Sequence, residues 1–574
     1  MGGLRGGHEE SRDVEQSPYE GDEATLGQQI EVASKEPYTI KLIKLLPRVD
    51  TSRKGNRQIQ ATIDVSLEEF SIDSSPPFIA LSYVWGTDAP RTSIRVNEEP
   101  FTIRANLTMA LRQFQTLCPN SYIWADAICI NQSNEKERSH LVQHMGQIFN
   151  TAERIRLTKP LEEGGFPALA YSRFSDSVYW QRIWVLQEIY LARELLFCCG
   201  SKTMPSKTLT GALMLLGAFQ AHLVSNNVEV DSNPRLHEFA FTTSFYPEMN
   251  RLVVYTSVYS AKIHSLRIAM AKFCFKELPR DSRSTDPRDM IYGLLGLANQ
   301  QERGYINADY KKPVQEVYCD VTRAFMQRGW TDILAWSQPP EKRIYGLPSW
   351  VPDFSSIIFE TMCSQGPATF WLPHFCAAAS LRPTSHTGDV EGAYEAIFIY
   401  LSETKTFVEE SIRLHPTPPP TIPDDHAKRL EATWRVPCAD QLRVSSNIIR
   451  NDTNMQRAYK AVFGKVSRCL TETKKGDDPK ISDEGRPYIQ TALRWVKKRP
   501  MLSTQGYVGL VPSDTQEGDV LVLLQNCISP YILRPQAREN EQSSYRLVGE
   551  AYVWGIMCGE YKPSESQGLI FNII

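Results

Sequence analysis

The stretch Phe78-Ile-Ala-Leu-Ser-Tyr-Val-Trp85 decides the fold class of this 574-residue chain. It is almost wholly apolar, it follows Pro76-Pro77, and Gly86 ends it, which is typical of a strand buried on both faces. Strands of this kind occur in parallel sheets that helices cover on both sides. The neighbouring sequence should therefore supply further buried strands that alternate with helices.

The segments around this strand do alternate between the two periodicities. Apolar residues at every second position predict strands, and apolar residues three or four apart predict helices. We predict strands over 38–46, 58–65, 121–130 and 195–199, a hairpin over 93–103 that turns at Asn97-Glu98, and helices over 107–117, 134–153 and 178–192. This order predicts an α/β domain with a mostly parallel sheet flanked by helices.

Composition along the chain predicts five parts. Residues 1–35 are polar and rich in Gly and Glu, which predicts a disordered tail. The α/β domain with its first strands should occupy 36–200, and a mainly helical region should follow over 201–358. Residues 359–500 form a variable mixed region with a Pro-rich loop, and the alternating runs of 501–574 predict a small β module.

Charge and cysteine content narrow the class of protein. Lys plus Arg number 63 and Asp plus Glu number 66, so the net charge is −3, which argues against a nucleic-acid-binding protein. The 12 cysteines include no C-x-x-C pair, which favours reduced thiols in a reducing compartment. The apolar stretch 209–224 is interrupted by polar residues and predicts a buried helix, not a bilayer span. We expect a cytoplasmic protein with no integral membrane segment.

Familiar ligand motifs are weak in this sequence. His140 and His144 have the spacing of two metal ligands on a helix, but no third ligand follows nearby, so we expect no metal site. Gly293-Leu-Leu-Gly296 and Gly506-Tyr-Val-Gly509 are poor matches to phosphate loops, and close packing explains both glycine pairs better.

The segment 175–188 contains the most informative acid. On one continuous helix, Trp180, Trp184 and Glu188 would lie along a single face, because they are four residues apart. A carboxylate beside apolar surface tends to have a raised pKa, which suits acid–base or cation-stabilising chemistry. The alternative is that both indoles belong to the core and Glu188 pairs with Arg182 or another surface cation.

Four blocks in a fixed order carry a resemblance to a known family. They are listed by their sequence: Phe78-Ile-Ala-Leu-Ser-Tyr-Val-Trp-Gly86, Asn106-Leu-Thr-Met-Ala-Leu-Arg112, Tyr122-Ile-Trp-Ala-Asp-Ala-Ile-Cys-Ile-Asn-Gln132 and Trp180-Gln-Arg-Ile-Trp-Val-Leu-Gln-Glu188. Together they resemble the fungal heterokaryon-incompatibility (HET) domain. Three further blocks resemble the region that follows this domain in many full-length members: Thr285-Asp-Pro-Arg-Asp-Met-Ile-Tyr-Gly-Leu-Leu-Gly-Leu297, Asp309-Tyr310 and Leu347-Pro-Ser-Trp-Val-Pro-Asp353.

The resemblance implies a role in fungal non-self recognition, in which fused, genetically unlike cells undergo regulated death. HET domains are considered remote relatives of TIR domains, and Ile79-Ala-Leu-Ser-Tyr83 and Trp184-Val-Leu-Gln-Glu188 are similar to the TIR strand and glutamate helix. Carried over, Glu188 would be the catalytic residue of an NAD glycohydrolase. NAD would be the substrate, and we expect no cofactor. The nucleotide would be held by Ser82, Trp85, Asp126 and Trp184.

Two hypotheses about activity stay open at this point. The first is an enzyme that cleaves NAD once it forms a homo-oligomer on activation. The second is a non-enzymatic recognition and signalling module that kills through incompatibility partner proteins. Under the second hypothesis residues 360–500 would discriminate between alleles, and the change Glu188→Ala would leave killing intact.

Overall fold

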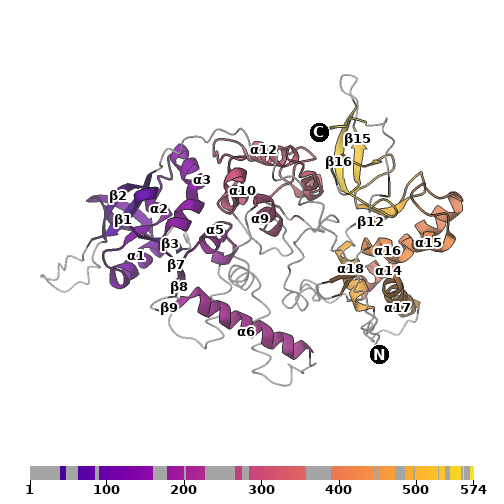
Figure 1. The fold of residues 1–574 in the computed structure, drawn as a ribbon, viewed down its shortest axis with the longest axis horizontal. Helices are drawn as coiled ribbons and strands as arrows, with labels where there is room; N and C mark the ends of the chain where they lie inside the picture. The colour runs from indigo at the N-terminus through magenta and orange to yellow at the C-terminus, as the bar shows by residue number, and fades with distance from the viewer. Residues whose placement is uncertain are drawn as a thin grey trace, which may run out of the picture.

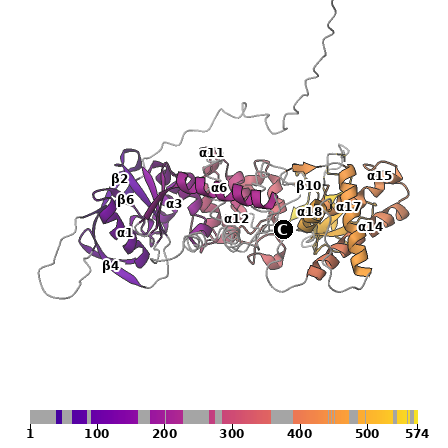
Figure 2. The same cartoon turned by 90° about the horizontal axis from the view of Figure 1, so that it is seen from below.

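The structure is a computed structural model of the chain. It describes residues 39–46, 63–83, 90–159, 178–199, 202–225, 265–273, 284–356, 358, 390–440, 442–444, 447–449, 452–471, 485–495, 498–527, 529–536, 543–557, 560–561 and 569–574. Along the long axis of Figures 1 and 2, the N-terminal sheet lies at one end, a helical region in the centre, and the C-terminal half at the other end.

A nine-stranded sheet forms the N-terminal part, with the order β5-β4-β2-β1-β6-β3-β7-β8-β9. Its strands are β1 (Thr39–Leu45), β2 (Asp64–Ser71), β3 (Phe78–Tyr83), β4 (Arg91–Val96), β5 (Glu99–Arg104), β6 (Tyr122–Trp124), β7 (Arg154–Lys159), β8 (Leu195–Cys199) and β9 (Lys202–Pro205). The helical elements between them are η1 (Ile72–Ser74), α1 (Ala105–Leu117), α2 (Asp126–Cys129), α3 (Glu135–Thr151), η2 (Val178–Gln181) and α5 (Val185–Tyr190).

The four central strands β6, β3, β7 and β8 are parallel, and antiparallel strands extend the sheet at both sides. This arrangement confirms the predicted fold class. All six residues of β3 are buried, as its composition predicted. In chain order the parallel strands lie 2-1-3-4 across the sheet, which is the order of doubly wound folds. The order reverses between β3 and β7.

Helices cover the sheet on both faces. Trp124 of β6 packs edge-on against Phe149 of α3, with ring centroids 5.5 Å apart. Arg156 of β7 lies over the ring of Phe114 in α1. Trp124 pairs with Ala80 of β3, and Arg156 pairs with the next residue, Leu81. Because successive residues of a strand point to opposite faces of a sheet, Trp124 and Arg156 also point to opposite faces. Consequently α3 and α1 cover opposite faces, and Ser82 points to the face of α3.

Most local predictions in this domain are confirmed. The hairpin turns at Asn97 and Glu98, which both have positive φ, as a two-residue hairpin turn requires. Helix α3 begins after Asn134, whose side chain accepts hydrogen bonds from the backbone of Lys136 and Glu137. The strand predicted over 58–65 starts later, at Asp64, and residues 58–62 lie outside the described part.

The strand predicted over 121–130 is wrong beyond Trp124. Residues Asp126–Cys129 form the short helix α2, in which the Asp126 carboxylate accepts the backbone N–H of Ala127 at 2.8 Å. Ile128 and Cys129 are buried in this helix. A short apolar run is compatible with a buried strand or a buried helix, so periodicity alone could not separate the two.

The single helix predicted over 178–192 is also wrong. It is divided into η2 and α5 by a turn at residues 182–184. The turn is held from outside the segment, because the Arg182 guanidinium donates to the backbone oxygen of Tyr83 at 2.9 Å. The face shared by Trp180, Trp184 and Glu188 required a continuous helix, so that argument does not hold.

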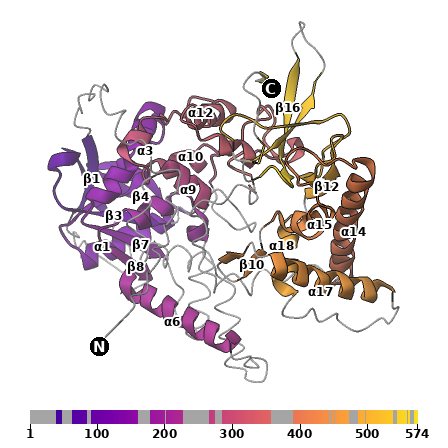
Figure 3. The same cartoon turned by 45° about the vertical axis from the view of Figure 1, so that its right-hand side comes forward.

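The central region is helical, as predicted. It contains α6 (Ser206–Ser225), α9 (Leu266–Phe273), α10 (Asp289–Leu295), α11 (Gln300–Arg303), α12 (Val314–Met326), η4 (Thr331–Trp336) and η5 (Pro340–Lys342). Helix α6 leaves the sheet edge beside β9 (Figure 1), and it also lies next to β8 in Figure 3. Its prediction as a buried helix is wrong for Met214 and Leu215, which are 51% and 74% exposed.

The C-terminal half combines helices with small sheets. Its helical elements are α14 (Val390–Leu414), α15 (His426–Leu430), α16 (Ala432–Arg435), η7 (Val436–Cys438), α17 (Asp452–Thr471) and α18 (Arg486–Trp495). Its strands are β10 (Leu442–Val444), β11 (Asn447–Ile449), β12 (Lys498–Leu502), β13 (Val508–Pro512), β14 (Val520–Val522), β15 (Tyr531–Pro535), β16 (Ser544–Glu550), β17 (Tyr552–Val553) and β18 (Asn572–Ile573). The predicted C-terminal β module is confirmed by the strands from β12 to β18.

One hydrophobic cluster joins the N-terminal sheet to the central helices. It extends from Ile40 in β1 to Ile358. The two parts pack backbone against backbone at two glycines, since a Cβ built on Gly146 of α3 would lie 2.6 Å from the Cα of Gly296. The close packing predicted for Gly293 and Gly296 is therefore confirmed. The sheet and the helical region form a single packed unit.

Candidate functional site

Three buried side chains meet on the α3 face of the sheet. Ser82 of β3 and Tyr179 of η2 both donate hydrogen bonds to Oε2 of Glu188 in α5, and the Tyr179 bond is 2.7 Å long. The two hydroxyl oxygens are 2.8 Å apart, so the three oxygens form a closed triangle. Ser82, Tyr179 and Glu188 are 2%, 6% and 5% exposed. We call this group the Glu188 site.

Burial dominates the electrostatics of the Glu188 site. Desolvation raises the pKa of Glu188, although the nearby Arg182 charge and the two hydroxyl donors act in the opposite direction. Burial and the adjacent Glu188 charge raise the pKa of Tyr179 well above its usual value. A carboxyl with a raised pKa can exchange a proton nearer to neutral pH than an exposed glutamic acid can.

The Glu188 site lies where doubly wound folds bind ligands. Ser82 is the penultimate residue of β3, and its partner in the next strand is Leu157 of β7. Strand order reverses between these two strands, and ligands of such folds bind outside the carboxyl ends at this reversal. A buried acid with a shifted pKa at this position is a candidate for chemistry.

Asp126 lies close by but has a different partner. Burial and the Asp126 carboxylate, which accepts a hydrogen bond from the Tyr83 hydroxyl, raise the pKa of Tyr83 well above its usual value. The Asp126 charge also contributes to the raised pKa of Glu188. Asp126, the first residue of α2, therefore lies near the carboxyl end of β3. Trp85 lies outside the described residues.

Arg182 interacts with Glu188 through its charge, and its hydrogen bond goes to another residue. Arg182 gives a hydrogen bond to the Tyr83 carbonyl, and it acts on Glu188 through its charge. Trp180 is buried against Tyr179, edge to face, with ring centroids 5.1 Å apart. Trp180 is thus a core residue, as the alternative interpretation proposed.

Trp184 contacts the helical region. Its indole N–H donates to Oδ2 of Asp289 in α10 at 3.3 Å, and the Tyr310 hydroxyl donates to Oδ1 of the same carboxylate at 2.5 Å. Burial raises the pKa of Asp289 to about 6. A residue predicted to bind the nucleotide is therefore part of the contact between α5 and α10.

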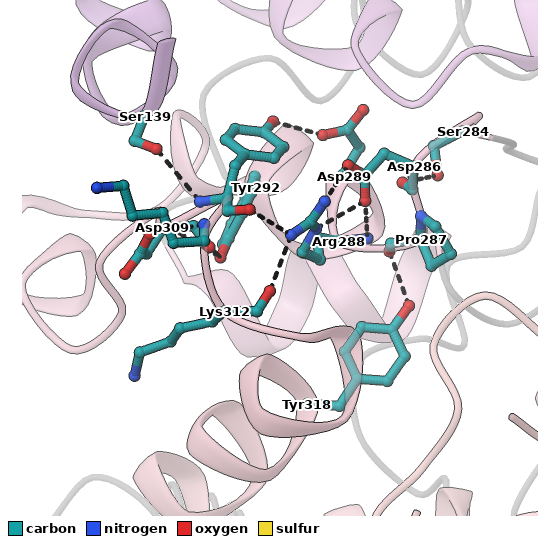
Figure 4. Close-up of polar contacts among 12 residues, drawn as sticks. Ser139, Ser284, Asp286, Pro287, Arg288, Asp289, Tyr292, Asp309, Lys312 and Tyr318 are labelled. Atoms are coloured by element: carbon teal, nitrogen blue, oxygen red, sulfur yellow. Dashed lines mark hydrogen bonds and ion pairs between the residues drawn. The ribbon is translucent and has the colours of Figure 1, made fainter. Parts of the chain in front are cut away.

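The block 285–289 forms a clamp at the start of α10 (Figure 4). Arg288 makes two bonds to the Asp286 carboxylate, of 2.9 and 2.7 Å, and donates to the backbone oxygens of Tyr310 and Lys312 at 2.6 and 2.8 Å. Tyr318 of α12 donates to the Pro287 oxygen at 2.7 Å. All of these contacts are internal, so this block is structural. We call it the Arg288 clamp.

Sequence reasoning missed Tyr179 and Gln187. Tyr179 is nine residues before Glu188 and comes near it only because the turn at 182–184 interrupts the helix. Gln187 is completely buried and donates to backbone oxygens of α10. Neither residue follows a periodic pattern, so only the tertiary structure could identify them.

Metal and membrane features were searched for in the same residues. Across the ranges that the structure describes, no group of three or more His, Cys, Asp or Glu side chains is arranged to hold a metal ion. No helix in this part of the chain is long and apolar enough to cross a membrane. His140 and His144 are linked instead by a 2.8 Å contact between the His144 ring and the His140 backbone oxygen.

Comparison with known proteins identifies two domains. Residues 78–163 match the family model of the heterokaryon incompatibility protein (HET) domain, and residues 481–572 match that of the Het-6 beta-barrel domain. The predicted resemblance to the HET domain is thus confirmed over residues 78–163, which contain three of the four blocks, and the fourth block, 180–188, follows the match.

A relative of known name matches most of the chain. Heterokaryon incompatibility protein 6, OR allele, from Neurospora crassa, is 23% identical over 637 aligned positions, which cover 85% of this chain and 90% of that protein. No solved structure matches the chain significantly.

Proposed function

We propose that this protein acts in fungal heterokaryon incompatibility, as a cytoplasmic protein that triggers regulated cell death. The HET domain and the similarity to heterokaryon incompatibility protein 6 along most of the chain support this role. We further propose that the Glu188 site does its chemistry by TIR-like cleavage of NAD.

The proposed reaction is hydrolysis of the bond between C1′ of ribose and the nicotinamide nitrogen. That bond breaks, nicotinamide leaves with the bonding electron pair, and positive charge develops on the ribose as an oxocarbenium-like state. Water then adds to C1′ and releases a proton. A carboxylate fixed near C1′ stabilises charge that exists only in the transition state, so it accelerates the reaction.

The observation that carries this proposal is the placement of Glu188 at the reversal of strand order, with hydroxyl groups as its partners. A ribose diol presents the same kind of donor as Ser82 and Tyr179 do. Both hydroxyl bonds go to Oε2 of Glu188, and the proposal assigns Oε1 to a substrate hydroxyl. The site therefore suits recognition of a sugar.

The other predicted residues take supporting roles in this proposal. Ser82 holds Glu188 and exchanges its bond for one to the substrate. Asp126 and Trp85 would line the nucleotide pocket at the carboxyl ends of β6 and β3. Trp184 contributes through its contact with Asp289 in addition to any contact with the nucleotide.

The test is inducible expression of the full chain and of Glu188→Gln in a compatible fungal host, scored for cell death and NAD level. The proposal predicts death and loss of NAD with the original chain, and neither with Glu188→Gln at equal protein level. Death without NAD loss, in a strain where Glu188→Gln also kills, would reject the enzymatic proposal.

A non-enzymatic module is the second candidate, and the tight enclosure of Glu188 favours it. Ser82, Tyr179 and Glu188 are all at most 6% exposed, so substrate entry requires the site to open. In this case incompatibility partner proteins, or a homo-oligomer formed on activation, would transmit the signal. Exchanging residues 360–500 between alleles would then change which partner triggers death, and Glu188→Gln would still kill.

A further inference from the structure

Helix α5, which carries Glu188, is too short to be stable by itself. It has six residues, and isolated helices below about 12 residues are marginal in water. Its position is therefore decided by what it packs against. Glu188 faces the sheet, while Trp184 and Gln187 of the same segment reach the helical region.

Gln187 bonds α5 to the end of α10. Its side-chain amide donates to the backbone oxygens of Gly293 and Tyr292, at 3.0 and 3.4 Å. Both oxygens lie in the last turn of α10, where a helix offers no partner of its own for its carbonyl groups. Gln187 is 0% exposed, so water cannot replace it. The residue next to Glu188 thus caps a helix of another region.

Glycine allows this contact. A Cβ built on Gly296 would lie 2.2 Å from Oε1 of Gln187 and 2.8 Å from the Cα of Gly146 in α3. Gly296, the residue that follows α10, therefore packs directly against the Gln187 side chain of α5 and the backbone of α3. The Arg288 clamp fixes the opposite end of α10 (Figure 4). One added methyl group at residue 296 would collide with the Gln187 amide and with the α3 backbone, so the amide could not keep its place against α10.

We propose that α10 sets the position of Glu188 against Ser82 and Tyr179, and that Gln187 is the positioning residue through which α10 acts. The inference rests on the proposed role of Glu188. It makes the helical region part of the working site, because the HET-matching residues 78–163 contain neither α5 nor α10. Movement of the helical region would then switch the site by releasing α5.

The experiment compares Gly296→Ala and Gln187→Met in the full chain with Gly211→Ala as the matched control. Gly211 is helical and exposed, and a Cβ there meets nothing within 4 Å. The first readout is the protonation midpoint of Glu188, from wild-type minus Glu188→Gln difference infrared spectra over a pH series, repeated in each variant background. The second is nicotinamide release from NAD, resolved into kcat and KM.

We expect Gly296→Ala and Gln187→Met to move the Glu188 midpoint down towards its ordinary range, because a displaced α5 admits water. We expect kcat to fall about 100-fold with KM nearly unchanged, since small displacements of a reacting group have effects of this size. Gly211→Ala should match the original chain in both readouts.

An unchanged Glu188 midpoint in folded Gln187→Met overturns the inference, and so does an unchanged kcat in an active enzyme. Gln187→Met decides the question if Gly296→Ala does not fold, because the side-chain volume is nearly conserved. If the original chain releases no nicotinamide, the proposed reaction fails, whereas the infrared midpoints still test the positioning role.

Discussion

Glu188 and Asp353 are both carboxylates that the fold removes from water, with 5% and 1% of their surface exposed. Asp353 receives hydrogen bonds on both oxygens, from the backbone of Ile344 and Ser355 and from the hydroxyls of Ser355 and Ser356. Glu188 receives two hydroxyl bonds on one oxygen, and burial raises its pKa. The arrangement at Asp353 stabilises a turn. At Glu188, by contrast, a further hydrogen-bond donor would stabilise the ionised carboxylate.

The contrast extends to the sequence blocks that contain the two acids. The blocks 285–289 and 347–353 have their charged groups satisfied internally, and Ser349 bonds the second block to β16 and to the backbone of Ile574. In the Glu188 site both hydroxyl donors bond the same carboxylate oxygen. A buried polar group that is poorly compensated lowers stability, and such groups are expected at functional or strained sites.

The largest effect on stability should come from Asp353→Ala. The change leaves four donors without their acceptor in a buried turn, and each lost bond of this kind costs about 1 kcal/mol or more, so we expect a loss of about 3 kcal/mol or more. Urea denaturation of the full chain measures it, with the exposed residue Asp73→Ala as control. Equal urea midpoints for the two variants would show that Asp353 does not stabilise the fold.

Arg288→Lys should have the next largest effect. Lysine cannot reproduce the paired bonds to Asp286 together with those to the Tyr310 and Lys312 oxygens, so we expect a loss of about 2 kcal/mol. The same denaturation measurement applies, with Arg413→Lys on the exposed part of α14 as control. A stability equal to that of the original chain would show that the clamp is dispensable.

Glu188→Gln should raise stability by about 1 kcal/mol above neutral pH. Because the folded pKa of Glu188 is raised above its unfolded value near 4.5, its contribution is fully present below that value and is lost as pH rises through the folded pKa. The advantage of glutamine should therefore grow with pH. Denaturation at pH 4 and pH 8 measures it, and a variant that is less stable at pH 8 would place Glu188 among the structural acids.

Tyr179→Phe should have the smallest effect. The Tyr179 hydroxyl lowers the pKa of Glu188, so removing it should raise that pKa further while the edge-on contact with Trp180 is kept. Difference infrared titration measures the shift, and Tyr292→Phe in α10 serves as control. A downward shift would mean that the removed hydroxyl had been excluding water instead of donating.

The sequence was sufficient to predict the elements that local residue patterns determine. β3, the hairpin at Asn97-Glu98, α1 and α3 are confirmed, because composition, turn chemistry and capping agree there. The sequence was insufficient at Asp126–Cys129, because a short apolar run is compatible with a strand or a helix. It was also insufficient at 182–184, where a hydrogen bond from Arg182 to the distant Tyr83 carbonyl holds a turn.

The candidate site could be predicted only in part, for the same reason. Ser82 and Glu188 were found through resemblance, and the structure places them in direct contact. Tyr179 contacts Glu188 because of a turn that no sequence pattern predicts. Trp184 bonds Asp289 because α10 lies beside it. Contacts between regions far apart in sequence decide which side chains complete a site.

The account rests on Glu188 being a working acid, and nicotinamide release from NAD by the purified, clustered full chain tests this most directly. We predict release by the original chain and at least a 100-fold lower rate for Glu188→Gln, which should be no less stable at pH 8. Equal rates for the two proteins, or a Glu188→Gln protein that loses activity only because it unfolds, would contradict it.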